Sequence, residues 1–298
     1  MTLLFTGAKG FLGRNTIPIL QSRNFEVSTL GQKDCDYNLN IGTEIPNFQR
    51  SFDIIFHAAG KAHIIPSNQQ ENEDFFAVNL QGTKNICEAI EKMILPKYFF
   101  FISTVAVYGA ETGDLLAENE QLKGNTPYAK SKILAEEFLI KWCQKHNVVL
   151  YILRPSLIAG KNAPGNLGDM TKAIKNGRYA NIAGGKAKKS IILAADFVQI
   201  IEKGIGKNGG IFNVSADENP DFYEISKTIS SKLGKKTPIN IPLFFIQIVA
   251  NVGDILGSWF PINSTKLLKI TTSLTFSNKK IRDELNFQPT HVLQNLEI

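Results

Sequence analysis

Three glycines spaced three residues apart, Gly7, Gly10 and Gly13, follow a short apolar run and open a segment with helical periodicity. At a turn from strand to helix, the first glycine permits a tight bend, the second lets a pyrophosphate approach the backbone, and the third permits close packing of the helix. The free N–H groups and positive dipole end of the helix would then face the phosphates. The pattern predicts a dinucleotide-binding turn, with Phe11 and Leu12 at the helix start among the cofactor-binding residues.

Apolar runs rich in β-forming residues alternate with helix-like segments through the first half of the chain. Strands are expected at residues 3–6, 25–30, 36–39, 53–58, 98–103 and 148–153, and helices at 11–23, 71–93 and 127–146. A helix between two such strands connects them in parallel. We therefore predict an α/β fold with a doubly wound parallel sheet of the Rossmann type and helices on both faces.

The amino-acid composition of the chain changes after residue 155. Gly, Asn and Lys become frequent between residues 159 and 189, and one more strand (211–214) and an amphipathic helix (222–233) follow. These changes predict two units that are interleaved along the chain. They are a dinucleotide-binding Rossmann domain, residues 1–155 and 189–214, and a smaller substrate-binding lobe, residues 156–188 and 215–298.

Composition and charge narrow the function classes. The formal net charge of +6 is mild and diffuse, so it suits an anionic ligand and makes no case for nucleic acid. The three cysteines and four histidines show no disulfide or metal-ligand spacing, so we expect no metal site and a reducing, cytoplasmic setting. Residues 241–260 are strongly apolar but fall short of the roughly 20 apolar residues of a membrane span. We expect a buried or interface helix there and no membrane insertion, with membrane contact as the alternative.

Several further motifs follow the glycine turn in a specific order. They are "DIIFHAAG", "NLQGTKN", "STVAVYG", "PYAKSK", "LRPSLIAG" and "LTFSNKKIRDELNFQP". Together with "TGAKGFLG", they resemble the extended short-chain dehydrogenase/reductase family, in particular its nucleotide-sugar epimerases and reductases. The resemblance implies NAD or NADP as cofactor. It places Asn38 near the adenine ring, and Ala58, Ala59 and Gly60 beside the ribose and nicotinamide. Asn79 matches a family position near the cofactor, although a helix-packing amide explains it equally well.

The end of the second predicted strand leaves the choice between NAD and NADP open. An acidic residue at this position would select NAD through its ribose hydroxyls. Gly31 stands there instead, followed by Gln32 and Lys33. Lys33 could bind the 2′-phosphate of NADP or be a solvated loop lysine, and Asp34 or Asp36 could still reach a ribose.

Tyr128 and Lys132 lie four residues apart on a predicted helix, so both face one side. A nearby ammonium and a positive nicotinamide ring favour the tyrosinate. Lowering a tyrosine pKa by about three units requires roughly 4 kcal/mol and yields a general acid–base near neutral pH. The "VYG" register aligns Thr104 with the family's catalytic hydroxyl, and strand alternation directs its neighbour Ser103 to the opposite side.

Two parts of the sequence indicate which reaction and substrate to expect. They are the residues directly after Thr104 and the segment from Asn166 to Lys189. The family's 4,6-dehydratases carry acidic residues after the catalytic threonine, whereas Val105 and Ala106 cannot move a proton, so dehydration is disfavoured. The resemblance also assigns Asn166 and Leu167 to a loop that binds the nucleotide-sugar diphosphate. Lys189 falls where the family has an arginine that reaches the same diphosphate.

The favoured function is that of an NAD(P)-dependent nucleotide-diphosphate-sugar 4-epimerase. An NAD(P)H-dependent 4-ketoreductase of a nucleotide-diphospho-4-keto-6-deoxysugar and a non-catalytic dinucleotide-sensing protein are the alternatives. The resemblance further implies a homodimer through the helices at 71–93 and 127–146. Phe75, Phe76 and Phe138 would supply its apolar surface.

Overall fold

A seven-stranded, wholly parallel sheet forms the centre of the molecule. The computed structural model describes residues 1–256 and 263–298, so the last part of the apolar segment 241–260 lies outside the described residues. The strand order β11-β7-β5-β4-β1-β2-β3 confirms the predicted doubly wound α/β sheet. The strands are β1 (Thr2–Thr6), β2 (Glu26–Gly31), β3 (Tyr37–Asn38), β4 (Ile54–His57), β5 (Tyr98–Ile102), β7 (Val149–Pro155) and β11 (Gly210–Val214).

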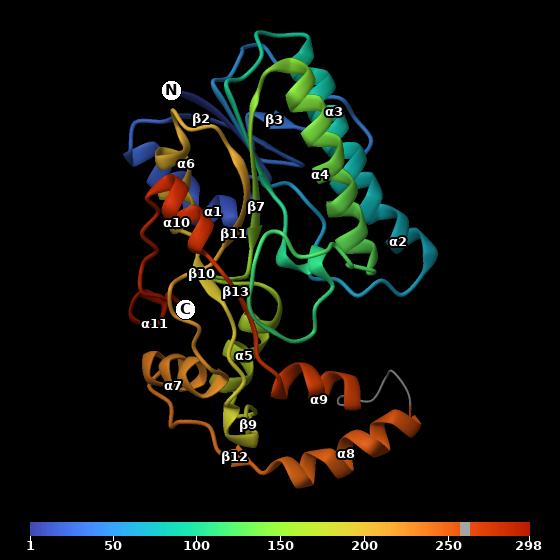
Figure 1. Ribbon diagram of the computed structural model, residues 1–298, viewed down its shortest axis with the longest axis vertical. Helices are drawn as coiled ribbons and strands as arrows, with labels where there is room; N and C mark the ends of the chain where they lie inside the picture. Colours follow the sequence, from blue (N-terminus) through green and yellow to red (C-terminus); the bar gives the residue numbers. More distant parts are fainter. Residues whose placement is uncertain (257–262) are drawn as a thin grey trace.

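Helices cover both faces of this sheet (Figure 1). On one side lie α1 (Phe11–Ser22), α6 (Asp196–Gly204) and α10 (Lys279–Leu285), and on the other lie α2 (Gln69–Phe76), α3 (Gly82–Glu91) and α4 (Pro127–His146). The side chains of β1 alternate between the two cores, with Leu3 and Phe5 in one and Leu4 in the other. Strands buried on both faces therefore read as unbroken apolar runs, as in this sequence.

The helix expected at residues 71–93 is interrupted. A π-helical turn, Ala77–Gln81, separates α2 from α3 and carries the fully buried Asn79. Such turns often occur at functional sites. Phe75, expected to offer apolar surface for a dimer, is instead 1% exposed and packs within the subunit, in ring contact with Tyr128.

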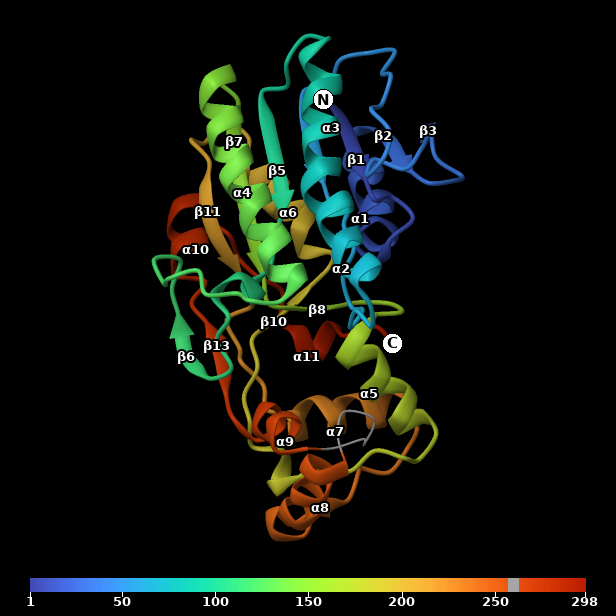
Figure 2. The same ribbon diagram turned by 90° about the vertical axis from the view of Figure 1, so that its right-hand side faces the viewer.

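The remaining elements build the lobe below the sheet and its connections (Figure 2). Three two-stranded parallel ladders pair β10 with β8, β12 with β9, and β13 with β6. These strands are β6 (Gly113–Leu116), β8 (Leu157–Ala159), β9 (Asn181–Ile182), β10 (Ile191–Leu193), β12 (Asn240–Ile241) and β13 (Leu274–Phe276). The helices are α5 (Gly165–Lys175), α7 (Phe222–Lys232), α8 (Leu243–Leu256), α9 (Ser264–Thr271) and α11 (Val292–Asn295), with short 3-10 turns at Val105–Tyr108 and Ala183–Gly185.

Candidate active site

The glycine turn joins β1 to α1 with almost no space between its backbone and its neighbours. Gly7 has a φ of 73°, and a Cβ there would lie 2.8 Å from the Ala59 Cα. A Cβ on Gly13 would lie 2.2 Å from the Ala8 carbonyl oxygen, so the third glycine lets the helix close against the turn itself. Side chains at these two positions would force the backbone to move.

Gly10 differs from the other two glycines because the space beside it is open to a ligand. A Cβ there would meet only the Gly7 carbonyl group, with 3.0 Å to its oxygen. Gly10 is also the N-cap of α1, and it has no side chain with which to cap the first N–H groups of the helix. Uncapped N–H groups beside an open backbone fit the pyrophosphate of a dinucleotide.

A chain of buried hydrogen bonds fixes this turn relative to the next strand. The Ala59 N–H donates to the Thr6 hydroxyl at 3.1 Å, and that hydroxyl lies 2.6 Å from His57 Nδ1. His57 Nε2 lies 2.9 Å from the Thr83 hydroxyl, which donates to the Asn79 carbonyl at 2.7 Å. Because the Thr83 hydrogen is used on Asn79, Nε2 donates and Nδ1 accepts. Burial lowers the pKa of His57 to about 3, so the imidazole is neutral.

The Asn79 side chain anchors the loop that follows β4. Its Oδ1 accepts from the Lys61 N–H at 2.8 Å, and its Nδ2 donates to the Lys61 carbonyl and to the Ser131 hydroxyl at 3.1 and 2.9 Å. These contacts support the interpretation of Asn79 as an amide that serves the packing of the fold. Binding of the cofactor by Asn79 stays a prediction.

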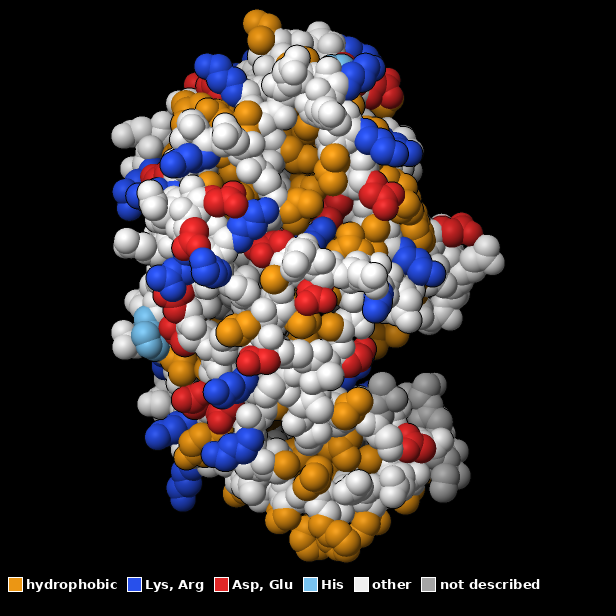
Figure 3. Space-filling model, in the orientation of Figure 1, with side chains coloured by type: hydrophobic (Ala, Val, Ile, Leu, Met, Phe, Trp, Pro, Cys, Tyr) orange, Lys and Arg blue, Asp and Glu red, His pale blue; other side chains and the backbone are white. Residues whose placement is uncertain are grey.

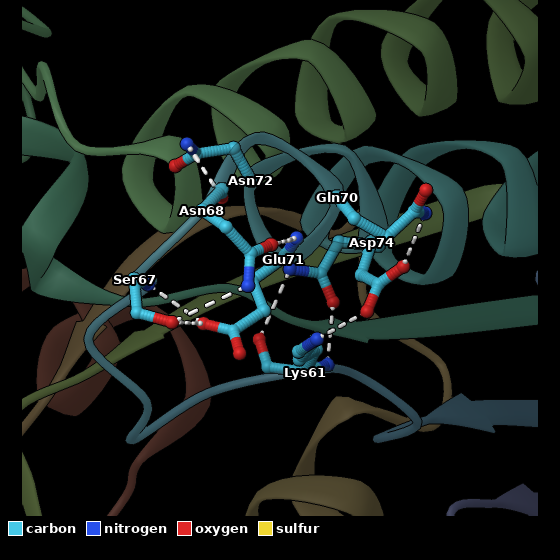
Figure 4. Close-up of polar contacts among 8 residues, drawn as sticks. Lys61, Ser67, Asn68, Gln70, Glu71, Asn72 and Asp74 are labelled. Atoms are coloured by element: carbon cyan, nitrogen blue, oxygen red, sulfur yellow. Dashed lines mark hydrogen bonds and ion pairs between the residues drawn. The ribbon is translucent and has the colours of Figure 1, made fainter.

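The same loop is held to the start of α2 by side-chain contacts (Figure 4). Lys61 Nζ lies 2.6 Å from an Asp74 oxygen. Asn68 caps α2 by accepting from the Glu71 N–H at 2.9 Å, and Glu71 accepts from the Ser67 N–H at 2.7 Å. This anchoring holds Gly60 over the neighbouring α4, where a Cβ on Gly60 would lie 3.2 Å from Lys132 Nζ.

Thr104, Tyr128 and Lys132 meet at the carboxyl end of β5. The Thr104 hydroxyl accepts from the Ala106 N–H at 3.1 Å, and its interaction with the Tyr128 side chain acts to lower the pKa of Tyr128. Lys132 Nζ donates to the Ile102 carbonyl at 2.8 Å and lies 4.7 Å from the centre of the Phe101 ring. Ser103 points the other way and binds Glu136, as strand alternation predicts. Of the three predicted catalytic side chains, Lys132 is the one that the structure brings next to Gly60.

The protein alone does not lower the pKa of Tyr128. Burial raises that pKa above its ordinary value, and the interaction with Thr104 opposes the rise only in part. Burial lowers the pKa of Lys132 to about 8, with the nearby Glu136 opposing the change. Lys132, whose ammonium donates to the Ile102 carbonyl, is not among the groups that shift the pKa of Tyr128.

Glu136 was not identified from the sequence as a residue of the candidate site. It is 2% exposed and forms a two-pronged ion pair with Arg154, at 3.1 and 2.6 Å. Arg154 also donates to the Tyr108 hydroxyl at 3.1 Å. Glu136 extends the four-residue spacing from Tyr128 through Lys132 by one more helical turn, and this spacing was the signal that could have found it.

The residues expected to select the cofactor lie at the end of β2. The Asn38 amide bridges the backbone N–H and carbonyl of Cys35, at 2.9 and 2.8 Å. Asp36 accepts from the N–H and hydroxyl of Thr29, at 2.7 and 2.8 Å. Lys33 is exposed, with its side chain in the loop between β2 and β3. Neither NAD nor NADP is selected by these contacts.

The predicted substrate residues occupy two separate places in the structure. Asn166 and Leu167 lie in the first turn of α5, where Asn166 is exposed and Leu167 is 3% exposed in the main core. Lys189 donates to the Thr272 carbonyl at 3.0 Å, and its ammonium lies 5.8 Å from the centre of the Phe222 ring. Burial lowers the pKa of Lys189, with Glu111 opposing the change. Binding of a diphosphate by these residues stays a prediction.

Comparisons with known proteins agree with this geometry. A model of the NAD dependent epimerase/dehydratase family matches residues 3–215. The N-acetyl-alpha-D-glucosaminyl-diphospho-ditrans,octacis-undecaprenol 4-epimerase of Escherichia coli O157:H7 is 25% identical over 311 residues, covering 99% of this chain and 93% of that protein.

Two solved structures share the fold over 99% of this chain and 96% of theirs. UDP-glucuronic acid 4-epimerase from Bacillus cereus, in complex with UDP-glucuronic acid and NAD, superposes with a TM-score of 0.74 at 18% identity. RMD from Pseudomonas aeruginosa, complexed with NADPH, superposes with a TM-score of 0.76 at 17% identity. These structures hold different dinucleotides, so the choice between NAD and NADP stays open.

Proposed function

The chain belongs to the NAD dependent epimerase/dehydratase family, and on that premise we propose that it is an NAD(P)-dependent 4-epimerase of a nucleotide-diphosphate sugar. One observation carries the proposal. Thr104 acts on the Tyr128 side chain to oppose the rise in its pKa, and Lys132 lies close to Gly60, which follows the strand adjacent to the glycine turn. This arrangement supports the proposal that Tyr128 acts as an acid–base group between a sugar hydroxyl and a dinucleotide.

In this proposal, one group of residues would hold the cofactor and another would transfer a proton. The glycine turn with Phe11 and Leu12 would hold the pyrophosphate, and Ala58, Ala59 and Gly60 would lie along the ribose and nicotinamide. When bound, NAD(P) supplies an acceptor and a donor of hydride. Epimerisation needs both, because the carbon is first oxidised and then reduced from its other face.

Tyr128 would take the proton of the sugar hydroxyl and later return it. Its raised pKa keeps the hydroxyl protonated in the protein alone, which suits the step that returns the proton. Thr104 would orient the reacting oxygen, because its hydroxyl interacts with Tyr128. Lys132, held by the Ile102 carbonyl, would bring a positive charge close to the cofactor.

Simple hydride chemistry is favoured over 4,6-dehydration. Water elimination needs further groups that give and take protons near the reacting carbons. The 3-10 turn directly after Thr104 begins with Val105 and Ala106, whose side chains cannot ionise. Single-site oxidation and reduction would require, besides the bound dinucleotide, only Tyr128, Thr104 and Lys132 in their proposed roles.

The alternative within the same chemistry is a 4-ketoreductase, and cofactor stoichiometry separates the two. The purified protein should be incubated with UDP-sugars and with a nucleotide-diphospho-4-keto-6-deoxysugar, each with and without added NADPH. Interconversion of two sugars without net cofactor loss supports the epimerase. Consumption of one NADPH for each ketosugar reduced would replace it, and cofactor binding without turnover would favour a sensing protein.

A second substrate class is favoured by one specific observation. The Escherichia coli relative, which matches 99% of this chain, is named for a sugar joined through diphosphate to a polyprenol. That substrate has the sugar diphosphate in common with a nucleotide-diphosphate sugar, but a polyprenol takes the place of the nucleoside. Turnover of a polyprenyl-diphosphate sugar, with none of the matching UDP-sugar, would assign this class to the chain.

We also propose a cytoplasmic homodimer that pairs α2, α3 and α4 with their copies. Leu134 and Ile140 on α4 are 40% and 43% exposed, which leaves apolar surface on that face. Cys35, Cys87 and Cys143 are free thiols, which fits a reducing compartment. Light scattering at micromolar concentration tests the dimer, and a monomer would refute it.

A further inference from the structure

We propose that one face of α8 docks the protein onto an anionic membrane surface. The proposal adds a location to the enzyme and does not rest on the proposed sugar chemistry. Helix α8 lies at the end of the molecule remote from the parallel sheet, as Figures 1 and 2 both show. Figure 3 shows hydrophobic side chains gathered at this lower end.

The side chains of α8 divide into three sectors when placed 100° apart around the helix. Ile246, Ala250 and Gly253 form the least exposed sector. Gln247, Asn251 and Asp254 form a polar sector beside it. The third sector, about 140° wide, is apolar and exposed. It consists of Phe244, Phe245, Ile248, Val249, Val252 and Leu256.

The apolar sector is unusually accessible for residues of these types. Phe244 is 68% exposed, Phe245 59% and Ile248 51%. Large exposed apolar patches mark sites of interaction with proteins or membranes. A helix of 14 residues is shorter than the roughly 20 residues that cross a bilayer. Helix α8 can therefore lie in the interface between lipid and water, with its apolar sector facing the acyl chains.

The charges that flank α8 in the sequence favour an anionic lipid surface over other occupants. Residues 227–270 contain six lysines, of which Lys269 is paired with Glu111, and one acidic residue, Asp254, whose carboxylate is bound by Ser264. Lys235 and Lys236 are exposed and lie a few residues before β12, the strand that leads into α8. A second copy of the chain placed face to face on α8 would bring like charges together, whereas acidic headgroups are attracted to them.

Flotation with lipid vesicles tests the proposal. The probes are vesicles of phosphatidylcholine alone and of phosphatidylcholine with an equal amount of phosphatidylglycerol. We expect the full chain to bind the anionic vesicles about 10-fold more tightly, and less tightly as salt is added. Ile248→Glu should weaken this binding about 10-fold or more. The matched control is Ile94→Glu, because Ile94 is 81% exposed outside α8 and should change nothing.

The lysines are tested separately from the apolar sector. Lys235→Gln with Lys236→Gln should remove most of the preference for anionic vesicles, whereas Lys141→Gln with Lys145→Gln, on exposed positions of α4, should keep it. Turnover of a soluble substrate should be equal in Ile248→Glu and the unmodified chain, which separates this test from the proposed function. Absence of vesicle binding, or an oligomer in solution that Ile248→Glu dissociates, would overturn the proposal.

Discussion

The Lys132 ammonium donates to the backbone carbonyl of Ile102 at 2.8 Å. This bond fixes the lysine at the end of β5, one strand away from the strand that leads to Gly60. Burial raises the pKa of Tyr128, and Lys132 is not among the groups that shift it. If Tyr128 is the proposed acid–base group, a bound cofactor would have to contribute to lowering its pKa.

Replacing Tyr128 with Phe should lower kcat by roughly 10²–10⁴-fold, the usual contribution of a general acid–base group. Dinucleotide affinity and the melting temperature should stay near those of the unmodified protein, because only a hydroxyl is removed. Tyr223→Phe, on a 39% exposed tyrosine, is the control. Retention of more than about a tenth of kcat would remove Tyr128 from the mechanism.

Gly10→Val should abolish dinucleotide binding. The valine side chain would fill the open space beside the turn, and the φ of −72° and ψ of 177° at Gly10 are accessible to valine, so the fold should survive. Gly10→Ala should weaken binding to a lesser extent. Titration calorimetry with NAD and with NADP, together with circular dichroism, measures both effects. Unchanged affinity in a folded Gly10→Val protein would place the cofactor elsewhere.

Acid should destabilise the protein through His57. Its pKa is lowered from 6.5 to about 3 in the folded state, so the unfolded chain binds the extra proton first. The free energy of unfolding should fall as pH drops through 6.5 toward 3, by roughly 1.4 kcal/mol per pH unit. Denaturant titrations of His57→Gln should show less of this slope, whereas His291→Gln, on a half-exposed histidine, should retain it. Equal slopes in all three proteins would contradict the assignment.

Lys189→Ala should raise KM for a nucleotide-diphosphate sugar roughly 10- to 100-fold, because one charge-assisted hydrogen bond contributes about 1.5–3 kcal/mol. Lys189→Arg should be nearly neutral or better, since its fork suits phosphate oxygens. Dinucleotide affinity should not change in either variant. Lys188→Ala, on the exposed neighbour, is the matched control. If KM is equal for both alanine variants, Lys189 serves the packing of the lobe through Thr272.

The sequence by itself determined the parallel sheet and the glycine turn. Strands buried on both faces must be apolar throughout, and a turn with Gly7 at a φ of 73° and Gly13 against the Ala8 carbonyl tolerates no other residue. Spacing along one helix likewise placed Tyr128 and Lys132 on one side. Local rules of this kind require no knowledge of distant parts of the chain.

Only the tertiary structure decided what each side chain meets. The direction of the Lys132 ammonium depends on a carbonyl 30 residues away, and the pKa of Tyr128 depends on burial by elements remote in the sequence. The π-helical turn at Asn79 and the Glu136–Arg154 pair also join separate elements. Helix α9 packs against one side of α8 and leaves the apolar sector exposed. The spacing of apolar residues along the sequence does not predict which side of a helix its neighbours will leave uncovered.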